Sequence, residues 1–319
     1  MKRLWELREL STLVILLLEV AFFGWYLWPE AGRAHPFLNA DNALLILKYS
    51  SIYGIAAIGA AAVIIAGGID LSPGAVIALT GVVAGWLFVG RGWSLAASSA
   101  VALAVGLAAG VLNAVLVVTV RLPAFIATLG VMGIARGAAF IITQGQYFDL
   151  SSALPPDWRV FGLPPDWIAP LLMVALAIVV QLLMTGFEWG RAVFAIGGNR
   201  TAALFSGVRV GLVEASVYVL AASLAAVSGL VLAVVQGQGK ADLATGYELD
   251  IIASAVVGGA SLAGGRGSVV GAVLGALIFG VLRNALPQIP GATFYDRLIV
   301  GVVVIVIVVM DQILRRRGD

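Results

Sequence analysis

Long apolar runs, separated by short polar or Gly/Pro-rich breaks, make up most of the chain. A helix needs about 20 consecutive apolar residues to cross the hydrocarbon core of a bilayer, and most of these runs approach or exceed that length. The pattern therefore predicts an all-α integral membrane protein with about ten transmembrane helices. The predicted spans are 10–28, 43–66, 74–90, 94–120, 124–143, 168–186, 211–235, 249–263, 268–286 and 296–314.

The eighth run, 249–263, is short for a full crossing. It leads into the glycine-rich stretch GGASLAGGRG at 258–267. Irregular backbone at membrane depth is tolerated only beside protein or water. We therefore expect this segment to be tilted, broken or re-entrant.

Composition supports the membrane assignment. The chain is 61% hydrophobic and 11% charged, with a mean hydropathy of +1.05, against roughly 25% charged residues in soluble domains. No polar stretch is large enough for a soluble domain, so residues 1–319 are expected to form a single transmembrane domain. The first run is too long for a signal-peptide core and is followed by Trp28 and Pro29 rather than by a small-residue cleavage site, which predicts a mature helix.

Cationic residues indicate the orientation. Clusters at Lys2/Arg3/Arg8 and at Arg315–Arg317, together with a modest excess in the alternate loops, favour cytoplasmic N- and C-termini in a bacterial inner membrane. This topology places the loop Gln144–Trp167 outside. A net charge of +2 gives no reason to expect a nucleic-acid partner, whereas membrane lipid is an expected one.

Several chemistries lack the residues they need. The sequence has no cysteine and a single histidine, His35, so thiol chemistry and a His/Cys metal site are not expected. Gly239-Lys240 is followed by Ala241 and lacks the earlier glycine of a phosphate-binding P-loop. We therefore expect no enzyme activity and no cofactor in this chain.

The segment GGIDLSPG at 67–74 breaks the pattern between the second and third runs. Ser72 before Pro73 predicts a helix start, with the hydroxyl as N-cap. A capped turn is one interpretation; a functional break carrying Asp70 is the other, because glycines and a carboxylate are unusual in so short a membrane loop. Within the runs, Glu19 and Arg136 are expected to pair with buried polar groups.

A second polar segment, 187–211, predicts a short helix. Asn199 is a good N-cap, Arg200 to Phe205 form fewer than two turns, and Gly207 suits the left-handed position after a helix. We expect Ala202, Ala203 and Phe205 on its surface. The helix could close a loop or enter the groove of a partner.

Four stretches together resemble the permease family of ribose-type ABC importers, which includes permeases for xylose, galactose, arabinose and autoinducer-2. They are GGIDLSPG at 67–74, LPAFIATLGVMGIARG at 122–137 with TQGQ at 143–146, AIGGNRTAALFSGV at 195–208, and YELDIIASAVVGGASLAGGRGSVVGAVLGA at 247–276. Their order and spacing also fit. Pro73 departs from the family, which commonly has a small aliphatic residue there.

The resemblance implies a substrate-translocating subunit with ten helices, paired with an identical or related second permease subunit around a central path. It implies two cytoplasmic ATPases that bind ATP and Mg²⁺, and an extracytoplasmic sugar-binding protein. The implied coupling helix contains Asn199, Arg200, Ala202, Ala203, Phe205, Ser206 and Gly207. The expected path residues are Asp70, Asn113, Phe125, Thr128, Gln146 and Gln236.

Three other functions fit part of the pattern. A branched-chain amino acid ABC permease shares the broad architecture. An ion-coupled secondary transporter also uses broken helices and buried carboxylates such as Asp70 and Glu19, and it would show proton-dependent uptake without an ATPase. A non-transporting scaffold would leave all solute uptake intact when its gene is lost.

Overall fold

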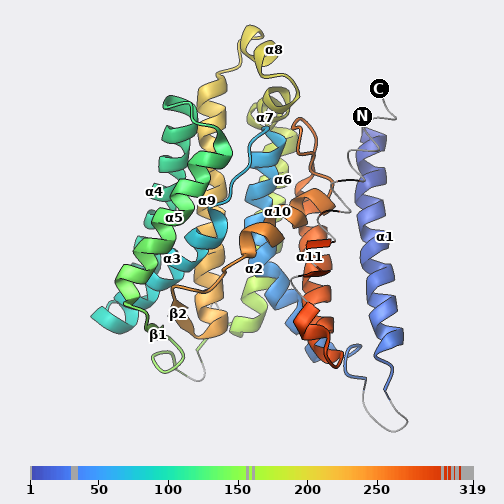
Figure 1. The fold of residues 1–319 in the computed structure, drawn as a ribbon, viewed down its shortest axis with the longest axis vertical. Helices are drawn as coiled ribbons and strands as arrows, with labels where there is room; N and C mark the ends of the chain where they lie inside the picture. The colour runs from blue at the N-terminus through green and yellow to red at the C-terminus, as the bar shows by residue number, and fades with distance from the viewer. Residues whose placement is uncertain are drawn as a thin grey trace.

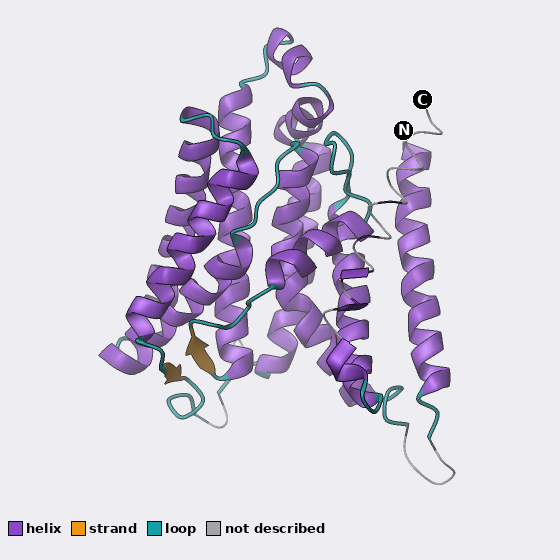
Figure 2. Ribbon diagram, in the orientation of Figure 1, coloured by secondary structure: helices purple, strands orange, loops and turns teal. Residues whose placement is uncertain are grey.

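The computed structural model describes residues 2–29, 35–155, 158–159, 162–295, 298–299, 301–302, 305 and 309. They form a helical bundle with a two-stranded sheet at one end (Figure 1; Figure 2). The α-helices are α1 Lys2–Tyr26, α2 Ala40–Ile65, α3 Pro73–Gly85, α4 Leu95–Ala114, α5 Ala124–Thr143, α6 Pro165–Gly186, α7 Glu188–Gly198, α8 Arg200–Phe205, α9 Val210–Gln236, α10 Tyr247–Val257 and α11 Val269–Ala285. The other elements are the π-helical turns η1 Trp86–Gly90 and η2 Val115–Thr119, the 3₁₀ turns η3 Leu286–Gln288 and η4 Ala292–Tyr295, and the strands β1 Tyr147–Asp149 and β2 Gln238–Lys240.

Within the described residues, eight helices are long and apolar enough to cross a membrane. They correspond to the first seven predicted runs and the ninth, so the prediction of an all-α membrane protein is confirmed. The eighth run is helical only over α10, whose 11 residues rise roughly 16 Å, about half of a bilayer core. A helix over the whole of 249–263 is therefore wrong, and the broken alternative holds. The tenth run, 296–314, lies largely outside the described residues, so the total of ten stays a prediction.

Helix α2 forms the centre of the bundle and is buried at every residue from Ser50 to Ile65. Small residues let neighbouring helices approach it and each other. A Cβ at Gly59 of α2 would lie 2.7 Å from the Cα of Ala221 on α9, and a Cβ at Gly110 of α4 would lie 2.9 Å from the Cβ of Ala222. Close contact between small residues is the usual way in which helices associate in membranes.

Two crossings of the bundle are only partly helical. Residues 66–72 with α3 form the first broken crossing, and residues 241–246 with α10 form the second. After α2, residues 66–72 descend beside α7 into the bundle before α3 begins (Figure 1). From the opposite end, residues 241–246 lead from β2 to α10. The two meet at their helix starts, where a Cβ at Gly74 would lie 2.8 Å from the carbonyl oxygen of Ala244. The break at GGIDLSPG is therefore one half of a paired structure rather than an isolated capped turn.

Glycines also join three connections at the end of the bundle where α8 lies. The N–H of Gly265 donates to the carbonyl oxygen of Ile65 at 2.8 Å. A Cβ at Gly264 would lie 2.6 Å from the carbonyl oxygen of Gly197, and one at Gly265 would lie 2.8 Å from the Cα of Gly198. The last turn of α7 thus packs by its backbone against the end of α2 and the loop before α11.

The two ends of the bundle carry different elements. The start of α1 lies at the same end as α8, whereas β1 and β2 lie at the other end (Figure 2). The strands are antiparallel, with Tyr147 opposite Lys240. This arrangement agrees with a topology that puts the N-terminus and the α7–α8 segment on one side and the Gln144–Trp167 loop on the other. The C-terminus lies outside the described residues.

Candidate functional site

A buried polar network surrounds the first broken crossing. Asp70 is 2% exposed, and its Oδ1 accepts hydrogen bonds from the N–H of Ser72 at 2.8 Å and from the Ser72 hydroxyl at 2.6 Å. The side-chain amide of Asn113 on α4 donates to that hydroxyl at 2.9 Å. Ser72 does precede Pro73 at the start of α3, but its hydroxyl caps no backbone N–H of the helix. The predicted hydroxyl cap is wrong: the Ser72 oxygen accepts from Asn113 rather than from a helix N–H, and Ser72 has the αR backbone (φ −78°, ψ −18°) instead of the extended one usual for an N-cap.

Thr128 of α5 joins the same network. Its hydroxyl oxygen accepts from the N–H of Leu71 at 3.1 Å and lies 2.9 Å from the carbonyl oxygen of Ala124, to which it donates. Residues Asp70, Asn113 and Thr128 therefore come together from three elements. Asp70 Oδ2 and Asn113 Oδ1 remain buried without a hydrogen-bond partner in the described part of the chain.

The other expected path residues lie elsewhere. Phe125 is on α5 and 51% exposed. Gln146, just before β1, and Gln236, at the end of α9, are exposed at the sheet end of the bundle. The six residues therefore do not form one site. Three share the network and two lie at the sheet end, with Phe125 apart on α5.

A cavity of about 1050 Å³ opens beside α8 and is named here the α8-end cavity. It reaches Gly67 and Gly68, the first glycines of the broken crossing, and Tyr218 of α9. Arg200 of α8 borders it and forms a two-point ion pair with Glu214 of α9, with N–O distances of 2.7 and 3.1 Å. The hydrogen bonds to the Glu214 carboxylate raise the pKa of Arg200, so the guanidinium stays charged.

A second cavity, of about 460 Å³, lies between α2 and α11 and is named here the α2–α11 cavity. Its lining residues are Asn42, Leu45, Ile46, Tyr49, Tyr53, Gly280, Arg283, Asn284, Pro287 and Gln288. Two of them contact the second broken crossing: Arg283 pairs with Asp250 of α10 at 2.6 Å, and the Tyr53 ring centroid lies 4.6 Å from that of Tyr247. The α8-end cavity is therefore lined by residues of the first broken crossing, and the α2–α11 cavity by residues that contact α10 of the second.

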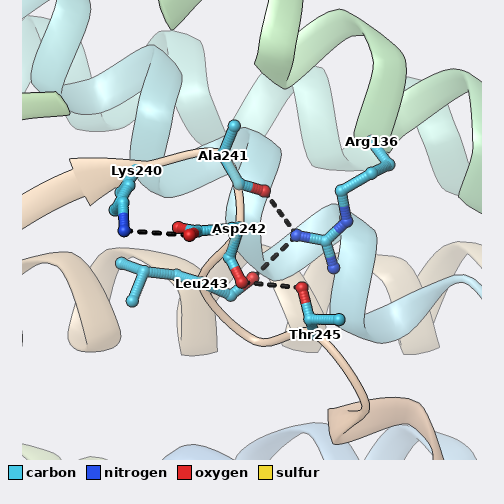
Figure 3. A network of polar contacts seen from close by, with 6 residues as sticks. All are labelled: Arg136, Lys240, Ala241, Asp242, Leu243 and Thr245. Atoms are coloured by element: carbon cyan, nitrogen blue, oxygen red, sulfur yellow. Dashed lines mark hydrogen bonds and ion pairs between the residues drawn. The ribbon is translucent and has the colours of Figure 1, made fainter. Parts of the chain in front are cut away.

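Arg136 of α5 fixes the turn that precedes α10 (Figure 3). Its guanidinium donates to the carbonyl oxygens of Ala241 at 2.5 Å and Leu243 at 2.7 Å. The side chain of Thr245 donates to the carbonyl oxygen of Asp242 at 2.6 Å in the same turn. Arg136 thus pairs with backbone groups, as expected for a cation in a bundle. For Glu19, Oε2 is buried without a hydrogen-bond partner among the described residues.

Helix α8 has the predicted local structure but not the predicted surface. The Asn199 side chain accepts from the N–H of Ala202 at 2.9 Å, and Gly207 has a φ of 85°. Ala203, however, is 4% exposed and packs with Ile196 and Val210, so its expected exposure is wrong. It is covered because α7 packs against α8. The sequence did not lead us to predict α7.

The exposed apolar side of α8 consists of Ala202, Leu204 and Phe205, of which Phe205 is 85% exposed. Sequence reasoning missed Leu204. The apolar spacing of Val193 and Ile196 was the available signal for an amphipathic α7, and it would have turned Ala203 inward.

Residues 42–308 match the family described as branched-chain amino acid transport system / permease component. The chain is similar to the ribose import permease protein RbsC of Escherichia coli, with 36% identity over 284 residues covering 86% of this chain and 87% of that one. RbsC of Bacillus subtilis is 35% identical, with 86% of each chain covered. The xylose transport system permease protein XylH of Escherichia coli is 30% identical, covering 97% of this chain and 94% of that one. No solved structure matches.

Proposed function

Because the chain belongs to the family of branched-chain amino acid transport system permease components, and within it to the ribose-type sugar ABC permeases, we propose that it is the translocating subunit of an ATP-driven importer. The solute is a sugar or a sugar-like small molecule, and it crosses the bacterial inner membrane by alternating access. The observation that carries this proposal is the pair of cavities, one lined by the first broken crossing and the other lined by residues that contact the second.

The barrier between the two cavities supports alternating access. Along α2, the buried residues 54–62 separate Tyr53, which lines the α2–α11 cavity, from Val63, which lines the α8-end cavity. The broken crossings contain residues that turn the chain, with a φ of 88° at Gly67 and 89° at Gly246. Discontinuous helices of this kind often line the solute site of membrane transporters. A shift of α3 or α10 about these glycines would open one cavity while closing the other.

Helix α8 is the proposed coupling helix. Its exposed Ala202, Leu204 and Phe205 would enter a groove of a cytoplasmic ATPase, which binds ATP and Mg²⁺. Asn199 caps the helix and Gly207 ends it, while Ser206 is exposed between them. The ion pair of Arg200 with Glu214 would pass a displacement of α8 to α9.

If α8 contacts the ATPase, the positions of the other proposed partners follow. The end with α8 and the start of α1 would face the cytoplasm, and the sheet end would receive the extracytoplasmic binding protein. A second permease subunit, identical or related, would complete the path. In this proposal residues 1–319 act as one transmembrane domain that has no chemistry of its own.

The test reconstitutes the chain in liposomes with the ATPase and binding protein whose genes are co-transcribed with its own. We expect ATP-dependent uptake of a labelled sugar such as D-ribose or D-xylose, and none from the chain alone. Uptake driven by a proton gradient without the ATPase would replace this proposal by a secondary transporter. Uptake of L-leucine but of no sugar would replace it by an amino acid permease.

A further inference from the structure

The wall of the α2–α11 cavity carries a row of side-chain amides. Asn42 of α2 and Asn284 of α11 exchange hydrogen bonds, with N–O distances of 3.0 and 2.8 Å. The amide nitrogen of Gln288, four residues after Asn284, donates to Asn284 Oδ1 at 3.0 Å. These bonds hold three amides in fixed orientations on one side of the cavity.

This row leaves one donor and one acceptor unused on neighbouring side chains. Asn284 uses one of its two amide N–H groups, toward Asn42, among the described residues. Gln288 Oε1 is buried and has no hydrogen-bond partner in that part of the chain. A buried polar atom left without a partner costs free energy, so the cavity favours a group that both donates and accepts hydrogen bonds. A hydroxyl is such a group.

Two tyrosines form another side of the cavity. The centroid of the Tyr53 ring lies 4.6 Å from that of Tyr247 and 5.7 Å from the Arg283 guanidinium carbon. Tyr49, one helical turn earlier, is partly exposed on the same cavity. Aromatic faces beside fixed polar groups suit a ring that is apolar on its faces and polar at its edge.

The charge of the cavity selects against ionic solutes. Arg283 is the only charged side chain among its described lining residues, and the carboxylate of Asp250 lies 2.6 Å from it. An amino acid would bring a carboxylate and an ammonium group into a site whose single charge is already compensated. Burying such charges without partners is costly, whereas a neutral solute avoids that cost.

We propose that the α2–α11 cavity is a subsite for a neutral polyhydroxylated solute of pentose size, with one hydroxyl bound between Asn284 and Gln288 and the ring against Tyr49 and Tyr53. The volume of about 460 Å³ lies within the usual range for small-ligand pockets. The inference rests on the proposed function, because it names where the transported solute is held on its way across.

Site-specific labelling tests the subsite without depending on transport. The chain has no cysteine, so Leu45→Cys places a single thiol on the cavity lining of the full-length permease in the assembled importer. We expect millimolar D-ribose or D-xylose to slow maleimide labelling of this thiol, and L-leucine to have no effect. Ser152→Cys, in an exposed loop, is the control. Because the sheet end is the proposed docking face of the binding protein, that protein is left out of the labelling reaction, and Ser152→Cys should then label at the same rate throughout.

A second substitution identifies the contact. Gln288→Ala leaves the mutual hydrogen bonds of Asn42 and Asn284 intact, and it should weaken sugar protection and raise the KM for uptake by about three- to tenfold. Gln181→Ala, an amide on α6 outside the cavity, is the matched control and should change neither. If Leu45→Cys does not accumulate, Pro287→Cys reports on the same cavity.

The outcomes separate the two proposals. If the wild-type importer takes up sugar but no sugar protects either reporter, the subsite is elsewhere and the proposed function stands. Protection by L-leucine instead of sugars would also overturn the subsite. If the wild-type importer takes up no sugar under ATP, the proposed function itself fails.

Discussion

Gly74 in the first turn of α3 lies so close to Glu248 in the first turn of α10 that a Cβ at position 74 would overlap the Glu248 carboxylate. The same Cβ would lie 2.8 Å from the carbonyl oxygen of Ala244, which cannot rotate away as a side chain can. The position of each broken crossing therefore constrains the position of the other. A larger side chain at residue 74 would change the distance between them.

Gly74→Ala is expected to force the two crossings apart. Overpacking of a closely packed core typically costs about 1–3 kcal/mol, so we expect a lower melting temperature and at least a severalfold loss of sugar uptake. Gly186→Ala at the end of α6, where a Cβ would meet nothing within 4 Å, is the matched control. Uptake and melting equal to wild type for Gly74→Ala would show that the crossings do not constrain each other.

Arg136→Gln should destabilise the turn before α10. Its guanidinium satisfies the carbonyl oxygens of Ala241 and Leu243, and leaving buried acceptors without partners costs about 1–3 kcal/mol. Arg136→Lys should lie between this variant and wild type, because an ammonium lacks the planar fork that bonds two carbonyls at once. Chemical unfolding and sugar uptake measure the order of the three proteins.

An unchanged free energy of unfolding for Arg136→Gln would mean that water replaces the guanidinium. Arg191→Gln provides the control for charge alone in the unfolding measurement, since Arg191 is exposed on α7.

Phe205→Glu tests the coupling surface. Phe205 is 85% exposed, so the variant should accumulate as wild type, yet burying its charge in an ATPase groove should prevent the ATPase from co-purifying. Ser152→Glu, at the other end of the bundle, should leave co-purification unchanged. Normal ATPase assembly and uptake with Phe205→Glu would remove α8 from the coupling role.

Ala203→Glu is expected to behave differently. Ala203 is buried against Ile196 and Val210, so a carboxylate there should lower the amount of folded permease rather than block docking alone. Equal accumulation of Ala203→Glu and Phe205→Glu would contradict this placement of Ala203.

The orientation of the chain in the membrane can be tested with two exposed positions. An impermeant maleimide added to whole cells should label Ser152→Cys strongly and Thr201→Cys weakly, because the former lies at the sheet end and the latter on α8. Opening the cells should expose Thr201→Cys. The reverse pattern would invert the topology.

The elements that the sequence predicted well depend on local signals. Apolar length alone predicts eight of the membrane helices, and the cap by Asn199 with the left-handed Gly207 predicts α8. Features that depend on contacts outside the element itself were missed. The burial of Ala203 requires the neighbouring helix α7, and the Ser72 hydroxyl accepts from Asn113 of α4 rather than from its own helix.

The α2–α11 cavity was also missed, and for the same reason. Asn42 and Asn284 lie at opposite ends of the sequence, and neither is unusual in its own segment. Only the packing of α2 against α11 turns two ordinary polar residues into part of one wall. In contrast, Asp70, Asn113 and Thr128 were named from the sequence and do lie together, Asp70 because its segment is unusual and the other two through the resemblance to a known family. Their role in a translocation path stays a prediction.

The glycine contacts at the end of α7 have a mechanical consequence. A side chain between two segments can change rotamer and absorb a displacement, but Gly197 and Gly198 meet Gly264 and Gly265 backbone to backbone, and Gly265 is bonded to Ile65. The end of α7, the loop before α11 and the end of α2 therefore have almost no room to move relative to one another. A displacement of α8 is therefore expected to move two segments together, the chain that follows Ile65 and the loop at 264–265. Helix α7 would transmit that displacement as a rigid element.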